Sequence, residues 1–148
     1  MNGIYNYLKY DENLSSSGMP TPEQLKEAAE AGVRVVINLA TSKSEGAIPN
    51  EAELVAGLGM EYIHIPVEWN EPTRRNLDDF LRAMESHRDD KVLVHCQANF
   101  RATGFVALYR ILRLGWNKEE AFHDLRRIWN PEDYPVWQAF IETHLLSR

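Results

Sequence analysis

The 148-residue chain has very little cysteine, and its single Cys96 cannot form a disulfide within the chain. Cysteine usage therefore gives no sign of an oxidising compartment. Positive charge is also scarce, because 16 Lys and Arg face 22 Asp and Glu and the formal net charge is -6. A general binder of nucleic acid or of anionic membranes carries a basic excess, so we expect no nucleic-acid partner.

Long hydrophobic runs are absent as well. The longest run, residues 33–40, is interrupted by Arg34 and Asn38, whereas a membrane span needs about 18 apolar residues. The first residues show no basic start followed by an apolar stretch, so a secretory signal peptide is not expected. We therefore predict a cytoplasmic protein with no membrane span.

The remaining composition is that of an ordinary globular protein, with 44% hydrophobic and 26% charged residues. A chain of about 150 residues buries about 68–70% of the surface that it exposes when unfolded. That burial is enough for a substantial core, and we expect residues 1–148 to form a single domain.

Segments typical of strands and helices alternate along the chain. Short apolar runs at 33–39, 62–66 and 91–95 predict buried strands, and the polar stretch 14–22 predicts a loop. Helix starts are indicated by capping patterns or by changes of period at Thr21-Pro22-Glu23-Gln24, Asn50-x-x-Glu53, Thr73, Arg101, Asn117-x-x-Glu120 and Pro135. This order predicts an α/β fold with a mostly parallel central sheet of about four strands flanked by helices. In such folds ligands bind at the carboxyl ends of the strands.

The most informative segment is VLVHCQANFRATG, residues 92–104. A buried strand is predicted to deliver Cys96 into a tight loop, and a helix follows at or just after Arg101. The backbone N–H groups of such a loop form an anion-binding nest, and the helix N-terminus adds partial positive charge. Arg101 adds a planar and permanently charged group. Cys96 is therefore expected to exist largely as a thiolate, which is a nucleophile beside an oxyanion site.

This segment resembles the signature loop of the cysteine-dependent protein phosphatases, H-C-x5-R-[ST], which joins a strand to a helix. More closely, the chain resembles the bacterial phosphatase-like domain family related to the dual-specificity phosphatases, a domain also found attached to β-lactamase-like hydrolases involved in sulfur oxidation. The segments SGMPTPEQL, VINL, IHIPVEWNEPT and HCQANFRAT carry the resemblance. It implies a dual-specificity-phosphatase-like fold and a phosphate-bearing substrate, such as a phosphotyrosine or phosphoserine, with no cofactor.

The resemblance also implies a role for each residue of the loop. Cys96 is the nucleophile that forms a phosphocysteine, and Arg101 binds the phosphoryl oxygens. His95 supports the thiolate from behind through hydrogen bonds rather than as a base. Backbone N–H groups complete the phosphate cradle, and they belong to Gln97, Ala98, Asn99, Phe100 and Arg101.

Three features depart from the pattern of the family. The spacing is C-x4-R, one residue shorter, and Ala102 stands where the family keeps Ser or Thr. Thr103, one position later, is the candidate substitute. Trp69 occupies the position of the family's acidic aspartate and is a candidate lid over the substrate. Glu68 and Glu71 on either side are the candidate general acids, since any carboxylic acid within hydrogen-bond reach can protonate the leaving oxygen.

The short loop leaves two other functions open. Rhodanese-type sulfurtransferases have a six-residue loop that begins with their cysteine, and the loop from Cys96 to Arg101 also has six residues. In that case Cys96 carries a persulfide. The other alternative is a non-catalytic module that binds a phosphate or sulfate group. The histidines are scattered and show no metal-ligand spacing, so no metal site is expected.

Overall fold

The computed structural model describes residues 1–146 and is built around one five-stranded sheet. The strands are β1 (Leu8–Lys9), β2 (Leu14–Ser17), β3 (Val35–Asn38), β4 (Glu61–His64) and β5 (Val92–His95). Their order in the sheet is β1-β2-β5-β3-β4. The last four of these run parallel to one another, and β1 is an antiparallel edge strand. The predicted mostly parallel α/β sheet is confirmed, with one antiparallel strand added at its edge.

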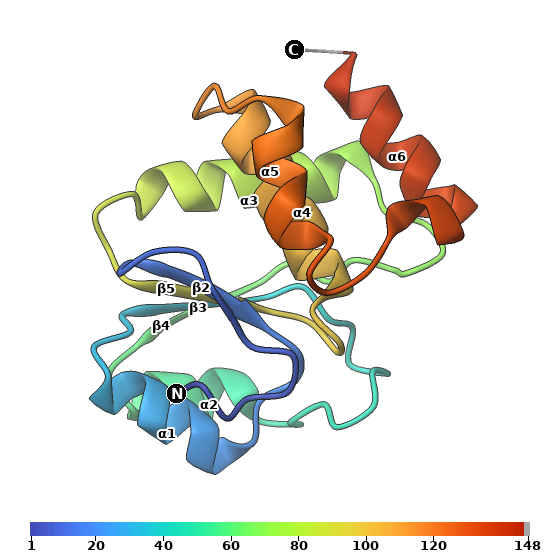
Figure 1. The fold of residues 1–148 in the computed structure, drawn as a ribbon. Coiled ribbons are helices and arrows are strands. Elements are labelled where there is room, and N and C mark those ends of the chain that lie inside the picture. The colour runs from blue at the N-terminus through green and yellow to red at the C-terminus, as the bar shows by residue number, and fades with distance from the viewer. Residues whose placement is uncertain (147–148) are drawn as a thin grey trace.

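The helices form a layer on each face of this sheet. They are α1 (Pro22–Glu30), α2 (Glu51–Gly57), α3 (Arg74–Ser86), α4 (Phe100–Leu112), α5 (Lys118–Leu125) and α6 (Pro135–Leu145), with a 3-10 turn η1 (Pro131–Asp133) before the last helix. Figure 1 shows α1 and α2 below the sheet and the remaining helices above it. The carboxyl ends of the parallel strands lie between these two layers, and the loop that joins β5 to α4 begins there.

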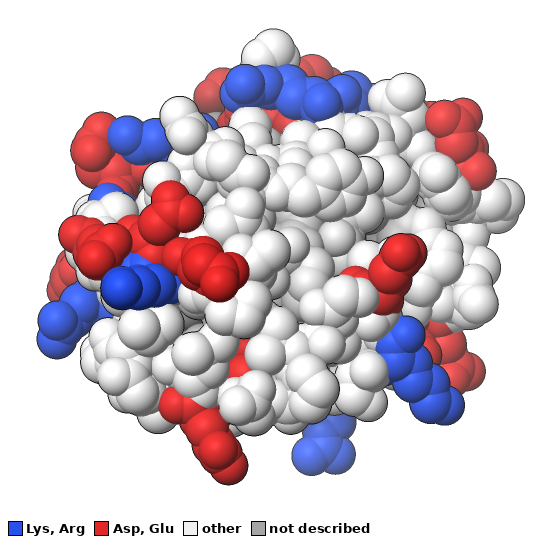
Figure 2. Space-filling view, turned by 90° about the horizontal axis from the view of Figure 1, so that it is seen from below, with Lys and Arg blue, Asp and Glu red and all other residues white. Residues whose placement is uncertain are grey.

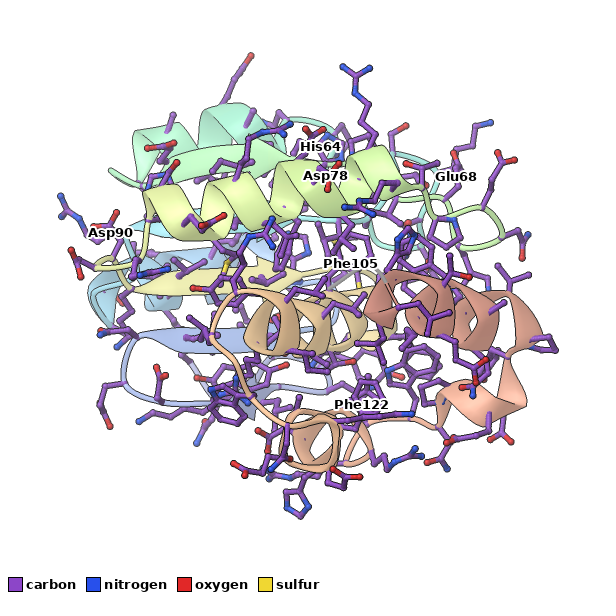
Figure 3. All side chains as sticks on the ribbon, turned by 90° about the horizontal axis from the view of Figure 1, so that it is seen from above. His64, Glu68, Asp78, Asp90, Phe105 and Phe122 are labelled. Carbon is purple, nitrogen blue, oxygen red and sulfur yellow. The ribbon has the colours of Figure 1, made fainter. Side chains whose placement is uncertain are left out.

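Side chains of the central strands alternate between the two layers. Val36 of β3 and Leu93 of β5 pack with residues of α1 and α2, whereas their neighbours Ile37 and Val94 pack with residues of α3, α4 and α6. Phe105 of α4 is fully buried in the upper layer (Figure 3). Because both faces of these strands are covered, their sequences are almost continuously apolar.

The predicted helix starts are mostly confirmed. Thr21 and Thr73 each form a capping box at the start of α1 and α3. Asn50 precedes α2 as predicted, but its side chain makes no capping hydrogen bond. The residue after it, Glu51, turns inward and is only 3% exposed.

Two predictions about strands are wrong. Residues 14–22 are not all loop, because the first four of them form β2 in the interior of the sheet. The serines of β2 are buried, and Ser16 Oγ lies 2.9 Å from the hydroxyl of Tyr10. Because β2 contains hydrogen-bonded serines in place of apolar residues, it lacks the apolar pattern that predicts the other strands. The strand predicted at 62–66 is present as β4, but it is not buried as predicted, because it lies at the edge of the sheet and exposes Glu61 and His64.

The helices and one face of the surface bear on whether the protein carries a membrane span or a basic patch. Within residues 1–146, no helix is both long and apolar enough to cross a membrane. Figure 2 shows the molecule from below, and on that face acidic and basic side chains form small clusters toward the rim around an uncharged centre.

Candidate active site

Cys96 follows directly after β5, a central strand of the sheet. Its side chain is 0% exposed, and its backbone N–H donates to the carbonyl oxygen of Ser17 at 3.2 Å. The neighbouring strand β2 therefore fixes the point at which the chain leaves the sheet. This placement at the carboxyl ends of the parallel strands is the one that the sequence predicts.

The loop after Cys96 turns sharply into α4 through Asn99. Asn99 has φ of +70°, in the left-handed region, and its side chain does not cap the helix. The first amides of a helix have no intrahelical acceptor, so the N–H groups of Phe100, Arg101 and Ala102 are available to an anion. A left-handed residue before a helix start also forms a concave nest of amides. The turn therefore offers amides to an anion, and the full cradle of residues 97–101 stays a prediction.

A second segment braces the loop from outside. Asn99 Nδ2 donates to the carbonyl oxygen of Asn6 at 2.8 Å, and Asn6 Nδ2 donates to the carbonyl oxygen of Ala98 at 3.0 Å. Gly18 lies so close that a Cβ atom there would be 2.7 Å from the carbonyl oxygen of Gln97. Sequence reasoning missed Asn6, because nothing near it in the sequence indicates a contact with a loop more than 90 residues away.

Arg101 is buried at the wall of the site, with 6% of its surface exposed. Its Nη1 donates to the carbonyl oxygen of Val67 at 2.8 Å, which anchors the guanidinium to the loop between β4 and α3. A guanidinium has five N–H donors, so most of them remain for an anion. The loop that carries the candidate acids is thereby tied to the arginine.

A pocket of about 380 Å³ opens above Cys96 and Arg101. Its lining also includes the loop residues Gln97 and Ala98 and three aromatic residues, which are Trp69, Phe100 and Tyr134. Within the described residues that line it, Arg101 carries the sole charged side chain. Tyr134 follows η1, far along the chain, and sequence reasoning missed it because only the packing of α6 brings it here.

The aromatic walls are held by a second layer of rings. Phe100 stacks on Trp129 at a centroid distance of 4.9 Å, and Trp69 stacks on Trp137 at 5.3 Å. Trp137 Nε1 also donates to the carbonyl oxygen of Trp69 at 2.7 Å. Trp69 is thus held at the pocket wall by Trp137, and its role as a lid over the substrate stays a prediction.

Thr103 does not stand in for the hydroxyl that Ala102 lacks. Its Oγ1 donates to the carbonyl oxygens of Asn99 and Phe100, at 2.7 and 3.1 Å, and accepts from Trp129 Nε1 at 2.8 Å. The hydroxyl proton is therefore committed to the turn that starts α4. Thr103 supports the shape of the loop and is not directed at the thiol.

The two candidate acids lie on a tight turn between β4 and α3 (Figure 3). The backbone N–H of Glu71 donates to the carbonyl oxygen of Glu68 at 3.1 Å. Both side chains are exposed, and neither lines the pocket. Only Trp69, which lies between them in the sequence, reaches the wall.

His95 lies behind the loop and is completely buried. Its Nε2 is 2.6 Å from a carboxylate oxygen of Glu51, and its Nδ1 is 3.3 Å from the carbonyl oxygen of Cys96. The predicted position of His95 behind the thiol is present, but sequence reasoning missed its partner Glu51. Among residues 1–146, no group of three or more His, Cys, Asp or Glu side chains is arranged to hold a metal ion.

Comparison with known proteins agrees with this geometry. Residues 13–115 match the model of a family described as "Polymorphic toxin system, DSP-PTPase phosphatase". A beta-lactamase hydrolase-like protein of Xylella fastidiosa is 32% identical over 105 residues. That match covers 69% of this chain but only 24% of the Xylella protein.

Solved structures similar to this chain include phosphatase-like proteins. The crystal structure of a protein described as a phosphatase (DUF442), from Shewanella putrefaciens CN-32, is 38% identical with a TM-score of 0.86. It covers 97% of this chain, and the match covers 90% of the Shewanella chain. TpbA from P. aeruginosa, solved in complex with phosphotyrosine, is 18% identical with a TM-score of 0.73, covering 92% of this chain and 82% of TpbA. The likeness to TpbA is one of fold.

Proposed function

Because the chain belongs to the DSP-PTPase phosphatase family of polymorphic toxin systems, we propose that it hydrolyses a phosphomonoester through a phosphocysteine intermediate on Cys96. One observation carries the proposal: the buried thiol, the Arg101 guanidinium and the free amides at the start of α4 meet in one pocket. A nucleophile surrounded by anion-binding groups is what phosphoryl transfer through a covalent intermediate requires.

The reaction proceeds in two displacements. The Cys96 thiolate attacks phosphorus, the bond from phosphorus to the leaving oxygen breaks, and that oxygen takes a proton from a general acid. Arg101 and the first amides of α4 stabilise the negative charge on the other phosphoryl oxygens. Water then attacks the phosphocysteine and gives a proton to the same carboxylate. The S–P bond breaks, which releases inorganic phosphate and restores the thiolate.

We propose that the proton comes from Glu68 or Glu71. Both lie on the turn that also carries Trp69 and that is tied to Arg101 through Val67. Neither carboxyl lines the pocket, so this role requires the exposed side chain of Glu68 or Glu71 to rotate toward a bound substrate. Catalytic contacts that are long in the free enzyme and shorten on binding are a known feature of general acids.

Substituting each carboxyl in turn tests this assignment. Glu68→Gln or Glu71→Gln is expected to lower kcat by about 10²-fold on an alkyl phosphate, which needs its leaving oxygen protonated. The same variant loses far less on 4-nitrophenyl phosphate, because nitrophenolate leaves without protonation. The variant at the other glutamate serves as the matched control. If both variants retain wild-type kcat on the alkyl phosphate, the acid is not on this turn.

The walls of the pocket favour aryl phosphates as the substrate class. Trp69, Phe100 and Tyr134 present flat apolar faces beside the phosphate cradle, and aromatic rings pack well against one another in offset or edge-to-face contacts. Arg101 supplies one positive charge, which suits a single phosphoryl group. We therefore propose a phosphotyrosine-like group as the preferred substrate over a polyphosphate.

The test of the function is to trap the intermediate. The protein is mixed with 4-nitrophenyl phosphate across about pH 5 to 8, quenched in acid during turnover, and measured by intact mass spectrometry. A phosphoryl group on the single cysteine, together with release of nitrophenolate, is the expected result. Turnover with no phosphoryl group on Cys96 at any pH, or no turnover with Cys96 shown to be reduced, contradicts the proposal.

The length of the loop supports one alternative. Because only six residues run from Cys96 to Arg101, a sulfurtransferase that carries a persulfide on Cys96 remains the second candidate. Incubation with thiosulfate distinguishes the two, since a sulfurtransferase releases sulfite and leaves one extra sulfur atom on Cys96. A non-catalytic anion-binding module gives neither product.

A further inference from the structure

A buried carboxylate lies behind the active-site loop, and the two displacements described above do not use it. Glu51 belongs to the first turn of α2, on the face of the sheet opposite to α4. Only 3% of its surface is exposed, and its carboxylate is 2.6 Å from Nε2 of the completely buried His95. A carboxylate taken out of water is costly unless it is paired. The contact with His95 therefore offsets the cost of burying Glu51.

The two contacts of His95 define where its protons lie. Nδ1 is 3.3 Å from the carbonyl oxygen of Cys96, and an oxygen of that kind can only accept, so Nδ1 carries a proton. Nε2 is 2.6 Å from a carboxylate oxygen of Glu51. The ring thus presents a donor to the backbone of Cys96 on one side and contacts the carboxylate on the other.

From this geometry we propose that Glu51 is a positioning residue for Cys96, acting through His95. By accepting a hydrogen bond from Nε2–H, the Glu51 carboxylate favours a ring that is protonated on both nitrogens. Nδ1–H then donates to the carbonyl oxygen of Cys96, and the positively charged ring favours the thiolate. The proposal deepens, and rests on, the function of Cys96 as the nucleophile.

Three other polar side chains lie near the Glu51–His95 pair, and each has a hydrogen-bond partner of its own. Asn38 of β3 donates through Nδ2 to Glu51 at 3.4 Å and to the hydroxyl of Tyr62 at 3.0 Å. Burial raises the pKa of Tyr62 to about 12, so this tyrosine stays neutral. His64 of β4 lines the same outer pocket as Glu51, and its Nε2 is 2.7 Å from the carbonyl oxygen of Ala40.

Two further groups face Cys96 from the other side of the loop. Arg101 of α4 lines the same pocket as Cys96, and Tyr10, which precedes β2, packs against the core cluster that contains Cys96. Burial raises the pKa of Tyr10, so it is neutral as well. Arg101 is present in every variant proposed below, and its effect on the thiol therefore cancels in the comparison.

The experiment compares Glu51→Gln with Glu53→Gln, which removes the same charge from an exposed position two residues along α2. Because Cys96 is the single cysteine, the rate of alkylation by iodoacetamide against pH measures its thiolate directly and needs no phosphatase activity. We expect the midpoint of this profile to move up by about one pH unit in Glu51→Gln, since a nearby positive charge favours the charged thiol. Glu53→Gln is expected to keep the wild-type midpoint.

Aryl phosphate kinetics provide the second readout. The acid limb of kcat/KM is expected to move by the same amount in Glu51→Gln, which is about a tenfold loss below the midpoint. At high pH, where the thiolate is fully formed, kcat is expected to return toward the wild-type value. A loss that is uniform across pH contradicts the positioning role. A shift in alkylation without any turnover in the wild type retains the role and rejects the proposed function.

A double-variant cycle tests whether Glu51 acts through His95. His95→Asn is expected to shift the midpoint by itself, and Glu51→Gln added to it is expected to cause no further shift. Additive shifts contradict the proposal. If Glu51→Gln does not fold, the nitrogen-15 spectrum of the His95 ring in the wild-type protein decides. Protons on both ring nitrogens across neutral pH support the proposal, and a ring that lacks either proton overturns it.

Discussion

Replacing Cys96 by serine is expected to abolish hydrolysis of an aryl phosphate, with kcat falling by at least about 10⁴-fold. A serine hydroxyl stays protonated at neutral pH and needs a base to become a nucleophile. Within residues 1–146, the lining of the pocket contains no His, Asp or Glu side chain that could act as that base. The thiolate is therefore the one nucleophile that this pocket can supply.

The same variant is expected to keep its affinity for inorganic phosphate. Arg101 and the amides of the loop hold the anion, and the exchange removes a negative charge that repels it. Steady-state kinetics with 4-nitrophenyl phosphate and calorimetric titration of phosphate measure the two quantities separately. Cys96→Ala is the control for the hydroxyl group. Turnover within tenfold of the wild type in either variant contradicts a phosphocysteine mechanism.

Replacing Arg101 by alanine is expected to lower kcat/KM by about 10³-fold and to weaken phosphate binding together with it. The guanidinium is buried and lines the pocket beside Cys96. In the proposed mechanism it stabilises the phosphoryl oxygens in the ground state and, more strongly, in the transition state. Arg101→Lys is expected to recover part of the binding but little of kcat, because an ammonium group cannot present two parallel donors.

The control for this prediction is Arg82→Ala. Arg82 lies on α3, its side chain is 70% exposed, and it pairs with Asp79 on the surface. Such pairs contribute little to stability, so this variant is expected to match the wild type in both measurements. Because Arg101 Nη1 also holds the carbonyl oxygen of Val67, thermal unfolding of Arg101→Ala must be followed in parallel. Unchanged phosphate affinity in a folded Arg101→Ala places the anion site elsewhere.

Local patterns in the sequence were sufficient for the strand, loop and helix that carry Cys96. The apolar run before Cys96, the short polar loop and the helical period after Arg101 each depend on neighbours within a few residues. Capping boxes at Thr21 and Thr73 are equally local, and both are present. Resemblance to a known family added the roles of these residues. The resemblance could not decide how the shorter C-x4-R loop changes anion binding, because the shape of an anion cradle depends on backbone geometry that no local sequence pattern predicts.

The sequence by itself determined an α/β chain with a cysteine and an arginine at one strand end. Only the tertiary structure decided what surrounds them. β2 contains buried serines, and the hydroxyls of Ser16 and Ser17 bond Tyr10 and the carbonyl oxygen of Gly18, so its place inside the sheet leaves no apolar signal. Asn6, Glu51 and Tyr134 reach the site from segments far from it in the chain. Contacts of this kind depend on how helices and strands pack across the whole sheet, which local periodicity does not encode.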